Sequence, residues 1–346
     1  MVASGPPTLH DLACVLHLHS TFSDGTGTVP EIVRAARRAG VDVVLLTDHD
    51  TLEARDRGYE GWHEDVLLLV GEEVSPRGGN HYLAFGLEEP IDHRGMGPAE
   101  IVRAVADAGG FGFAAHPFSR GSERFRTKPM PWSDLDCEGL AGIEVWSFVT
   151  DEGETIGSIR DALRFLAHPE RFATGPPEEN RREWDRLNAS GRRVVGIGGL
   201  DAHQIGKRIA DRFVVRLMGY ARSFQQLRTH VLVDELPTGD LEHDREQVYA
   251  ALREGRSYMA LDSLAPARGF AFWAEEGRLR ARLPRSARLR LYRDGVVVHE
   301  DHAAELDQAP DAPGSYRVEA SLQVHGIDQA WVLSNPLFMR NPGESS

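Results

Sequence analysis

The chain has 346 residues, of which 41% are hydrophobic, and its formal net charge is −14 at pH 7. This length exceeds one ordinary domain, so we expect a large domain followed by a smaller one, and the apolar fraction excludes global disorder. The negative charge argues against a nucleic-acid backbone as an obligate partner.

Up to about Phe213, short apolar runs alternate with helical stretches. This alternation is typical of parallel β/α units, and runs that are nearly continuous in aliphatic residues indicate strands covered on both faces. We expect seven strands in this region, at Cys14–His17, Val41–Thr47, Val66–Val70, Tyr82–Phe85, Gly112–Ala115, Gly142–Trp146 and Val194–Ile197.

Helices are expected between these strands. Pro30 near a first turn and Gly40 as a stop predict a helix that opens at Val29. The polar segment of about 151–193 predicts an insertion of one or two helices over the mouth of a barrel. The other expected helices are Pro98–Ala108, Glu179–Asn188 within the insertion, and Arg245–Glu254.

The pattern changes after about Ala260. Ala287–Tyr292 alternates as a strand does, and Asp294-Gly295 predicts a hairpin turn before Val296. We therefore expect a large domain over 1–260 and a small β-sandwich domain over 261–346. No run reaches the roughly 18 apolar residues that span a bilayer. Because there is also no signal peptide, we expect a cytoplasmic protein without membrane partners.

Histidines and carboxylates recur at the ends of the predicted strands. His17 and His19 share one side of a strand because side chains alternate. An isolated His-x-His pair is more often structural, but here similar residues follow later strands. Glu72 and Glu73 compete for one position, and only the alternation of their strand decides between them. The remaining members of this set are Asp48, His49, Asp50, His81, His116, Asp201 and His203.

All of these side chains offer nitrogen or oxygen ligands, which suit Zn, Mn or Fe. Their number exceeds what a mononuclear site needs. Asp24-Gly25 alone would be taken for a turn, and Asp50 alone for a helix cap. The sequence therefore predicts a multinuclear metal centre in which two or three divalent ions are the cofactors.

The motifs resemble those of the polymerase-and-histidinol-phosphatase (PHP) domain family, in the family order and over roughly Cys14 to Phe213. The resemblance implies a distorted seven-stranded β/α barrel whose metal centre hydrolyses phosphoesters. The packing motifs Trp184 to Leu187, Ala251 to Tyr258 and Trp331 to Pro336 are similar to those of the branch that contains carbaryl hydrolase. The PHP-like motifs are His17 to Gly25, Thr47 to Asp50, Gly71 to Ser75, Ala115 to Pro117 and Asp201 to His203.

The resemblance also implies how a trinuclear metal centre would be held. His17, His19, Glu73 and Asp201 would bind the first ion. Asp24, His49 and His203 would bind the second, although some family members have a histidine where Asp24 stands. Glu73 would bridge to a third ion held by His81 and His116, and Asn80 could take the place of His81.

The expected activity is hydrolysis of a small phosphate ester by a hydroxide that bridges two ions. The sequence does not choose among His203, Asp50 and a metal-bound water as the group that protonates the leaving group. Asp48 is expected to orient an imidazole from behind. Cationic side chains on the loops after His116 and His203 are candidates for binding the phosphate, against an interpretation as ordinary surface charge: Arg120, Arg126, Lys207 and Arg208, with Arg77 a weaker candidate.

Two alternatives remain open at this point. The same centre could attack a carbonyl carbon, which would make the protein a carbamate, ester or amide hydrolase. A third hypothesis is a binding module whose metal site is a relic, and the complete ligand set argues against it. In each of the enzymatic interpretations the partner is a small-molecule substrate.

Overall fold

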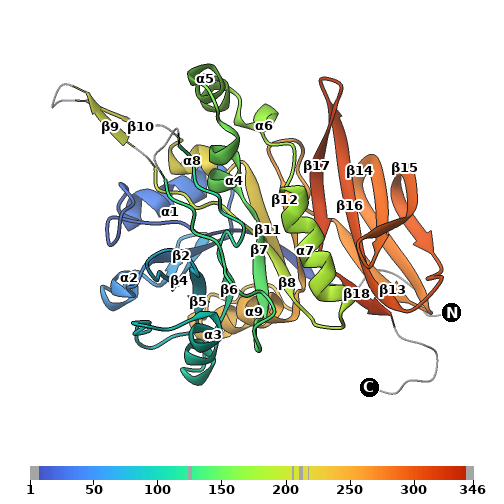
Figure 1. The fold of residues 1–346 in the computed structure, drawn as a ribbon, viewed down its shortest axis with the longest axis horizontal. Helices are drawn as coiled ribbons and strands as arrows, with labels where there is room; N and C mark the ends of the chain where they lie inside the picture. Colours follow the sequence, from blue (N-terminus) through green and yellow to red (C-terminus); the bar gives the residue numbers. More distant parts are fainter. Residues whose placement is uncertain (1–7, 124–126, 205, 210–212, 217, 340–346) are drawn as a thin grey trace.

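One large sheet organises the chain (Figure 1). The computed structural model describes residues 8–123, 127–204, 206–209, 213–216 and 218–339, with the backbone alone at 159, 170, 171, 206–209 and 213–216. The N-terminal strands are β1 (His10–Leu16), β2 (Val43–His49), β3 (Gly61–His63), β4 (Val66–Val74), β5 (Tyr82–Phe85), β6 (Phe111–Ala114), β7 (Gly142–Ser147), β8 (Val195–Gly199), β11 (Leu227–Val233) and β12 (Ser257–Leu261).

The remaining elements surround or extend this sheet. A separate hairpin is formed by β9 (Gly206–Ile209) and β10 (Phe213–Arg216). The C-terminal strands are β13 (Ala271–Glu275), β14 (Arg278–Arg293), β15 (Val296–Gln308), β16 (Gly314–Val324), β17 (Ile327–Ser334) and β18 (Leu337–Met339). The helices are α1 (Val29–Ala39), α2 (Glu53–Asp56), α3 (Pro98–Asp107), α4 (Phe148–Thr155), α5 (Ile159–Ala167), α6 (Pro169–Phe172), α7 (Glu178–Ala189), α8 (Tyr220–Ser223) and α9 (Leu241–Glu254).

The seven strands expected in the N-terminal region are all present, but the sheet is open. The paired order is β11-β1-β2-β4-β5-β6-β7-β8, and β11 occupies the edge of β1 that a closed seven-stranded barrel would give to β8. Pairing is also not parallel throughout. β5 is antiparallel to β4 and to β6, because the short link from Val74 to Tyr82 returns the chain as a hairpin without a crossover helix.

Side chains bond the edge of β8 that the open sheet leaves unpaired. The Thr229 hydroxyl accepts from Gly198 N at 2.9 Å and donates to Gly198 O at 2.8 Å. The Asn335 amide does the same for Gly196, with Gly196 N to Oδ1 at 2.7 Å and Nδ2 to Gly196 O at 3.0 Å. Buried backbone groups need such partners, so these two residues replace the missing ladder.

Alternate residues of the strands pack into two different cores. Val44 and Leu46 of β2 belong to the core that includes α1 and α3, whereas Val43 and Leu45 share a core with α9. We call the second side the inner face. The continuous aliphatic runs were expected to have both faces covered, and this is confirmed.

The helical insertion differs from its prediction. It contains four helices, α4 to α7, where one or two were expected. The predicted helix at Glu179–Asn188 is α7, but it lies between β7 and the C-terminal sheet and does not cover the ligand-bearing strand ends (Figure 1). Trp184 and Leu187 are fully buried in the core there, so burial of the apolar side of α7 fixes its position.

The C-terminal part is rich in β-structure, as expected, and the predicted hairpin joins β14 to β15 at Asp294-Gly295. β12 pairs with β11 on one side and with β17 on the other. The two parts of the chain therefore share one hydrogen-bonded sheet. Among the described helices, none combines the length and apolarity that crossing a bilayer requires.

A buried ionic cluster joins β1, β11 and β12. His230 Nδ1 lies 2.7 Å from Asp11 Oδ1 and His230 Nε2 lies 3.3 Å from Asp262 Oδ2. The Tyr258 hydroxyl donates to the other oxygen of Asp11 at 2.6 Å. Burial lowers the pKa of His230, but the hydrogen bonds to Asp11 and Asp262 outweigh burial and raise that pKa above its usual value.

This cluster makes stability depend on pH. Because the folded pKa of His230 exceeds the unfolded value of about 6.5, its ion pairs contribute fully below that pH and lose their contribution as the pH rises through the folded pKa. We expect the wild type to exceed His230→Gln in free energy of unfolding by an amount that is largest near about pH 6 and shrinks at higher pH. Urea unfolding of both metal-free proteins across a pH series measures this, and a constant difference would contradict it.

Candidate metal centre

The ligand-type side chains converge because most of them lie on the inner face at one edge of the sheet. In β4, Leu67 and Leu69 face inward, so alternation brings Glu73 inward and turns Glu72 outward. The alternative left open by the sequence is thereby decided for Glu73. Glu72, on the other side of the strand, accepts a hydrogen bond from Ile91 N at 2.8 Å.

The same alternation places His49 inward at the end of β2, in line with Leu45. His81 precedes its strand, yet it reaches the same edge because β5 is antiparallel to β4. His17, His116 and Asp201 follow β1, β6 and β8 with positive φ angles of 59°, 29° and 50°. Such backbone is uncommon outside glycine, and at these residues it turns the chain directly after each strand.

Glu73 occupies the middle of the cluster. Its Oε1 lies 2.8 Å from His81 Nδ1 and 3.2 Å from His116 Nε2. Its Oε2 lies 3.4 Å from His17 Nε2 and 3.3 Å from His19 Nε2. One carboxylate thus presents a different oxygen to each of two pairs of imidazoles.

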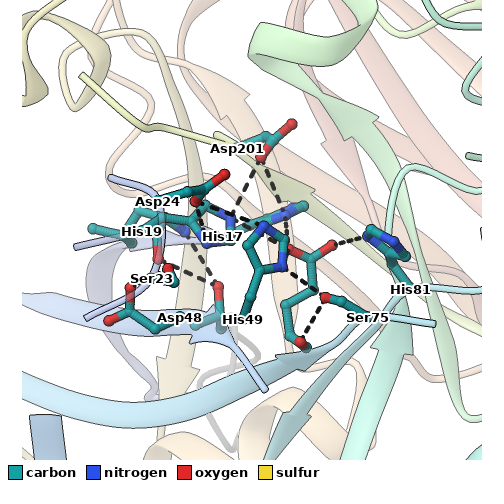
Figure 2. A network of polar contacts seen from close by, with 12 residues as sticks. His17, His19, Ser23, Asp24, Asp48, His49, Ser75, His81 and Asp201 are labelled. Carbon is teal, nitrogen blue, oxygen red and sulfur yellow. Dashed lines mark hydrogen bonds and ion pairs between the residues drawn. The ribbon is translucent and has the colours of Figure 1, made fainter. Parts of the chain in front are cut away.

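Four overlapping groups of donor atoms lie close enough to hold a cation, with all atoms of a group within 4.8 Å of one another. Figure 2 shows the imidazoles and carboxylates directed toward one another. Every one of the nine residues predicted as ligands belongs to at least one group. The groups are His19 with Asp24, His49 and His203; His17 with His19 and Glu73; His17 with His116 and Asp201; and His49 with Glu73 and His81.

Several donor atoms of this cluster lack hydrogen-bond partners within the described part of the chain, which leaves them available to bind a cation. Among the described residues, buried atoms without a hydrogen-bond partner include His17 Nε2, both ring nitrogens of His19, and Glu73 Oε2. Unpaired buried polar atoms are costly. Their concentration in one place, with nitrogen and oxygen donors only, matches the ligand preferences of Zn, Mn or Fe.

Burial and mutual attraction shift the pKa values of the cluster. Burial raises the pKa of Glu73, but the imidazoles led by His17 outweigh it and hold the pKa well below its usual range. Burial lowers the pKa of His17, and Glu144, Glu73 and Asp201 reverse this and raise the pKa well above its usual value. Burial also lowers the pKa of His203, but Asp201 and Asp24 outweigh burial and raise that pKa to about 9. Without cations, protons on imidazoles balance the carboxylates, so cation binding releases protons.

Glu144 was not identified from the sequence. It is fully buried in β7, and its two oxygens accept from His17 Nδ1 at 2.9 Å and from His116 N at 2.7 Å. It therefore leaves Nε2 of His17 directed at the cluster. Gly199 makes room for it, because a Cβ there would lie 2.0 Å from Glu144 Oε1. The available signal was a single acid inside an otherwise apolar strand, which is costly unless it has partners.

Two further polar residues support the cluster. The Thr150 hydroxyl of α4 donates to Asp201 Oδ2 at 2.6 Å, while Asp201 Oδ1 faces the imidazoles of His17 and His19 at 3.5 Å. Ser75 Oγ lies 2.6 Å from His49 Nδ1. Thr150 was not singled out from the sequence, because a threonine in a helical segment carries no distinguishing signal. Ser75 was noted only as the last residue of the motif from Gly71 to Ser75, without a role.

Asp48 has a different contact from the one predicted. It faces the opposite side of β2 from His49, and its oxygens accept from Ser20 N at 2.7 Å and from the Ser20 and Ser23 hydroxyls at 2.6 Å. Asp48 thus holds the loop that follows His19, and no hydrogen bond to an imidazole occurs for it among the described contacts. The reason is again the alternation of the strand.

The other predicted catalytic and substrate-binding residues are not gathered at the cluster to the same degree. Asp50 accepts from Ser75 N at 2.8 Å and pairs with His93 Nε2 at 3.1 Å. Arg120 is exposed and its guanidinium pairs with Glu179 of α7. Arg126 and the side chains of Lys207 and Arg208 fall outside the described part of the chain.

Comparison with known proteins confirms the resemblance for part of the chain. Residues 16–183 match the model of the PHP domain. An uncharacterised protein of Methanocaldococcus jannaschii is 27% identical over 137 residues, which cover 36% of this chain and 77% of that protein. Phosphoribosyl 1,2-cyclic phosphate 1,2-diphosphodiesterase of Eggerthella lenta is 38% identical over 80 residues, covering 21% of this chain and 30% of that enzyme.

Among solved structures, a two-domain protein from Bacteroides vulgatus that contains a predicted PHP-like metal-dependent phosphoesterase aligns over 96% of this chain and 97% of its own. Its sequence identity is 17% and the TM-score is 0.46.

Proposed function

Taking the PHP domain of residues 16–183 as the premise, we propose that this protein is a metal-dependent hydrolase that cleaves small phosphate esters. The observation that carries the proposal is the arrangement around Glu73. One buried carboxylate offers an oxygen to each of two imidazole pairs, and among the described residues the neighbouring Nε2 of His17 and both ring nitrogens of His19 have no hydrogen-bond partner. The diphosphodiesterase of Eggerthella lenta supports the choice of a phosphate ester.

We assign two or three divalent cations to the donor groups. His17, His19, Glu73 and Asp201 would hold one ion, and Glu73 would share another with His81 and His116, which combines members of neighbouring groups. A further ion would lie among Asp24, His49 and His203. When bound, such ions lower the pKa of water to about 7 and neutralise the charge of a phosphate.

The chain's own residues would supply orientation and proton transfer. Glu144 and Thr150 hold His17 and Asp201 in place. His203 and Asp50 are each partly exposed, at 22% and 43% of their side chains. Asp50 could deliver a proton to a leaving group at the solvent side, and His203 could do so only in a two-ion centre that leaves its imidazole free of metal. Arg126, Lys207 and Arg208 remain our candidates for binding the phosphate, whereas Arg120 would first have to leave Glu179.

We also place the chain, on its packing motifs, in the carbaryl-hydrolase-like branch. That placement keeps the alternative of a carbamate, ester or amide substrate within the test. Attack on a carbonyl carbon and attack on phosphorus would use the same ligands, so the choice depends on the substrate and not on the donor set.

A chelation and substrate panel tests the proposal. We expect protein stripped with a chelator to lose activity on p-nitrophenyl phosphate, bis-p-nitrophenyl phosphate and nucleotides, and to regain it with Mn or Zn. The stripped protein should also unfold at a lower temperature, because an ion that binds only the folded state stabilises it. If the protein hydrolysed a naphthyl carbamate but none of the phosphate esters, the alternative would replace the proposal. Full activity of metal-free protein would overturn both.

A further inference from the structure

The two ring nitrogens of His49 face two different candidate cation positions. Its Nε2 lies 3.7 Å from Asp24 Oδ1, and its Nδ1 lies 3.2 Å from Glu73 Oε2. Accordingly it belongs to two donor groups, one with Asp24 and His203 and one with Glu73 and His81. A neutral imidazole has a single nitrogen lone pair available for a metal because the other nitrogen carries hydrogen. His49 can serve only one of these groups.

The hydrogen bonds of Ser75 determine which nitrogen carries the hydrogen. Ser75 Oγ lies 2.7 Å from the backbone oxygen of Glu73, a separation that requires a hydrogen between the two oxygens. A carbonyl has none to give, so the single hydroxyl hydrogen of Ser75 points at Glu73 O. Ser75 Oγ also lies 2.6 Å from His49 Nδ1, and that contact requires a second hydrogen. Only Nδ1 can supply it.

The surroundings of Nδ1 agree with this assignment. Its other neighbour is Glu73 Oε2 at 3.2 Å, a carboxylate oxygen, which is also an acceptor. His203 repeats the arrangement, because its Nδ1 lies 3.0 Å from the backbone oxygen of Asp201, which can only accept. Both imidazoles therefore present Nε2 to Asp24, at 3.7 Å from His49 and 3.2 Å from His203.

We propose that Ser75 is a positioning residue that fixes the Nδ1–H tautomer of His49 and so commits this imidazole to the cation held with Asp24 and His203. The inference rests on the proposed metal-dependent function. Its consequence is that the group of Glu73 and His81 lacks His49 as a ligand and needs His116 to complete it. Figure 2 shows Ser75 between His49 and the main chain of β4.

The test uses Ser75→Ala, Ser75→Thr and a matched control. Ser286 makes a similar contact, 3.0 Å from His302 Nδ1, but in the C-terminal sheet, so Ser286→Ala removes a serine–histidine contact away from the cluster. We expect Ser75→Ala to weaken binding of one Zn²⁺ by about 10- to 100-fold, the usual effect of losing a partner of a metal-binding histidine. Ser75→Thr should retain tight binding, and Ser286→Ala should bind as the wild type does. Zinc titration followed by calorimetry measures these affinities.

A second readout follows the tautomer directly. Long-range ¹H–¹⁵N spectra of zinc-loaded wild type should show His49 with a protonated Nδ1 and a metal-bound Nε2. A protonated Nε2, or zinc affinity in Ser75→Ala equal to that of the wild type, would overturn the inference. Zinc binding and the tautomer are measured without substrate. If both results were as expected and the protein hydrolysed no phosphate ester, the proposed function would be wrong and the inference about Ser75 would stand.

Discussion

Glu73→Gln should reduce kcat/KM for a phosphate ester by about 10³-fold or more, since the contribution of a metal centre to transition-state stabilisation is several kcal/mol and each 1.36 kcal/mol is about tenfold. Glutamine has nearly the same shape but no charge, and it offers one oxygen where Glu73 offers two. It would therefore leave one of the two imidazole pairs, His81 with His116 or His17 with His19, without its carboxylate oxygen. Steady-state kinetics and metal content per chain measure the effect, and fewer bound ions are expected.

The adjacent acid provides the control. Glu72 is equally buried on the other side of β4, and burial raises its pKa to about 7. Glu72→Gln preserves an acceptor for Ile91 N and resembles the protonated acid. We expect this variant to retain its metal and nearly all of its activity. If Glu72→Gln and Glu73→Gln lost activity equally, the assignment of Glu73 to the metal centre would fail.

Arg317→Ala should lower the free energy of unfolding by about 3–5 kcal/mol, the usual cost of removing one partner of a buried ion pair. Arg317 is 3% exposed and forms a bidentate pair with Asp185 of α7, at 2.6 Å and 2.8 Å. It also bonds Glu319 at 3.1 Å and lies over the ring of Tyr292. The substitution would leave the partly buried Asp185 without this partner and the buried Glu319 with Arg181 alone, at 2.9 Å, between α7 and β16.

Chemical denaturation gives the free energies, with Arg57→Ala as the control. Arg57 pairs with Glu53 at the exposed surface of α2, at 66% side-chain exposure, where such pairs contribute little. Asp185→Asn offers a milder change at the same junction and should also destabilise. Equal unfolding midpoints for Arg317→Ala and Arg57→Ala would contradict the prediction.

The strands could be predicted from the sequence because their aliphatic runs are long and both of their faces are buried. The direction of each strand and the open form of the sheet could not be predicted. The reversal of β5 depends on a short link, and the open edge depends on Thr229 and Asn335, which lie far along the chain from β8. The position of α7 depends on the C-terminal sheet that it packs against. Each of these features arises from contacts between distant segments, which local periodicity does not record.

The ligands of the candidate site could be predicted from the sequence more readily than the residues that hold those ligands in place. Imidazoles and carboxylates after successive strands are conspicuous, so all nine predicted ligands lie in the donor groups. The residues that hydrogen-bond to the ligands are of common types. The roles of Ser75, Thr150 and Glu144 can be assigned only from the atoms that they contact. Asp48 shows the converse, since a residue inside a conspicuous motif faces away from the centre.

The position of β12 between β11 and β17 has a consequence for self-association. A chain cut after Leu261 would retain β12 but lose β17, whose residues Val332 to Ser334 pair with Ala260 to Tyr258. The bared backbone of β12 would then be an unpaired, largely apolar strand edge onto which strands of other molecules could add. In the intact protein β17 pairs with this edge, so we expect the C-terminal strands to protect residues 1–261 from such strand addition.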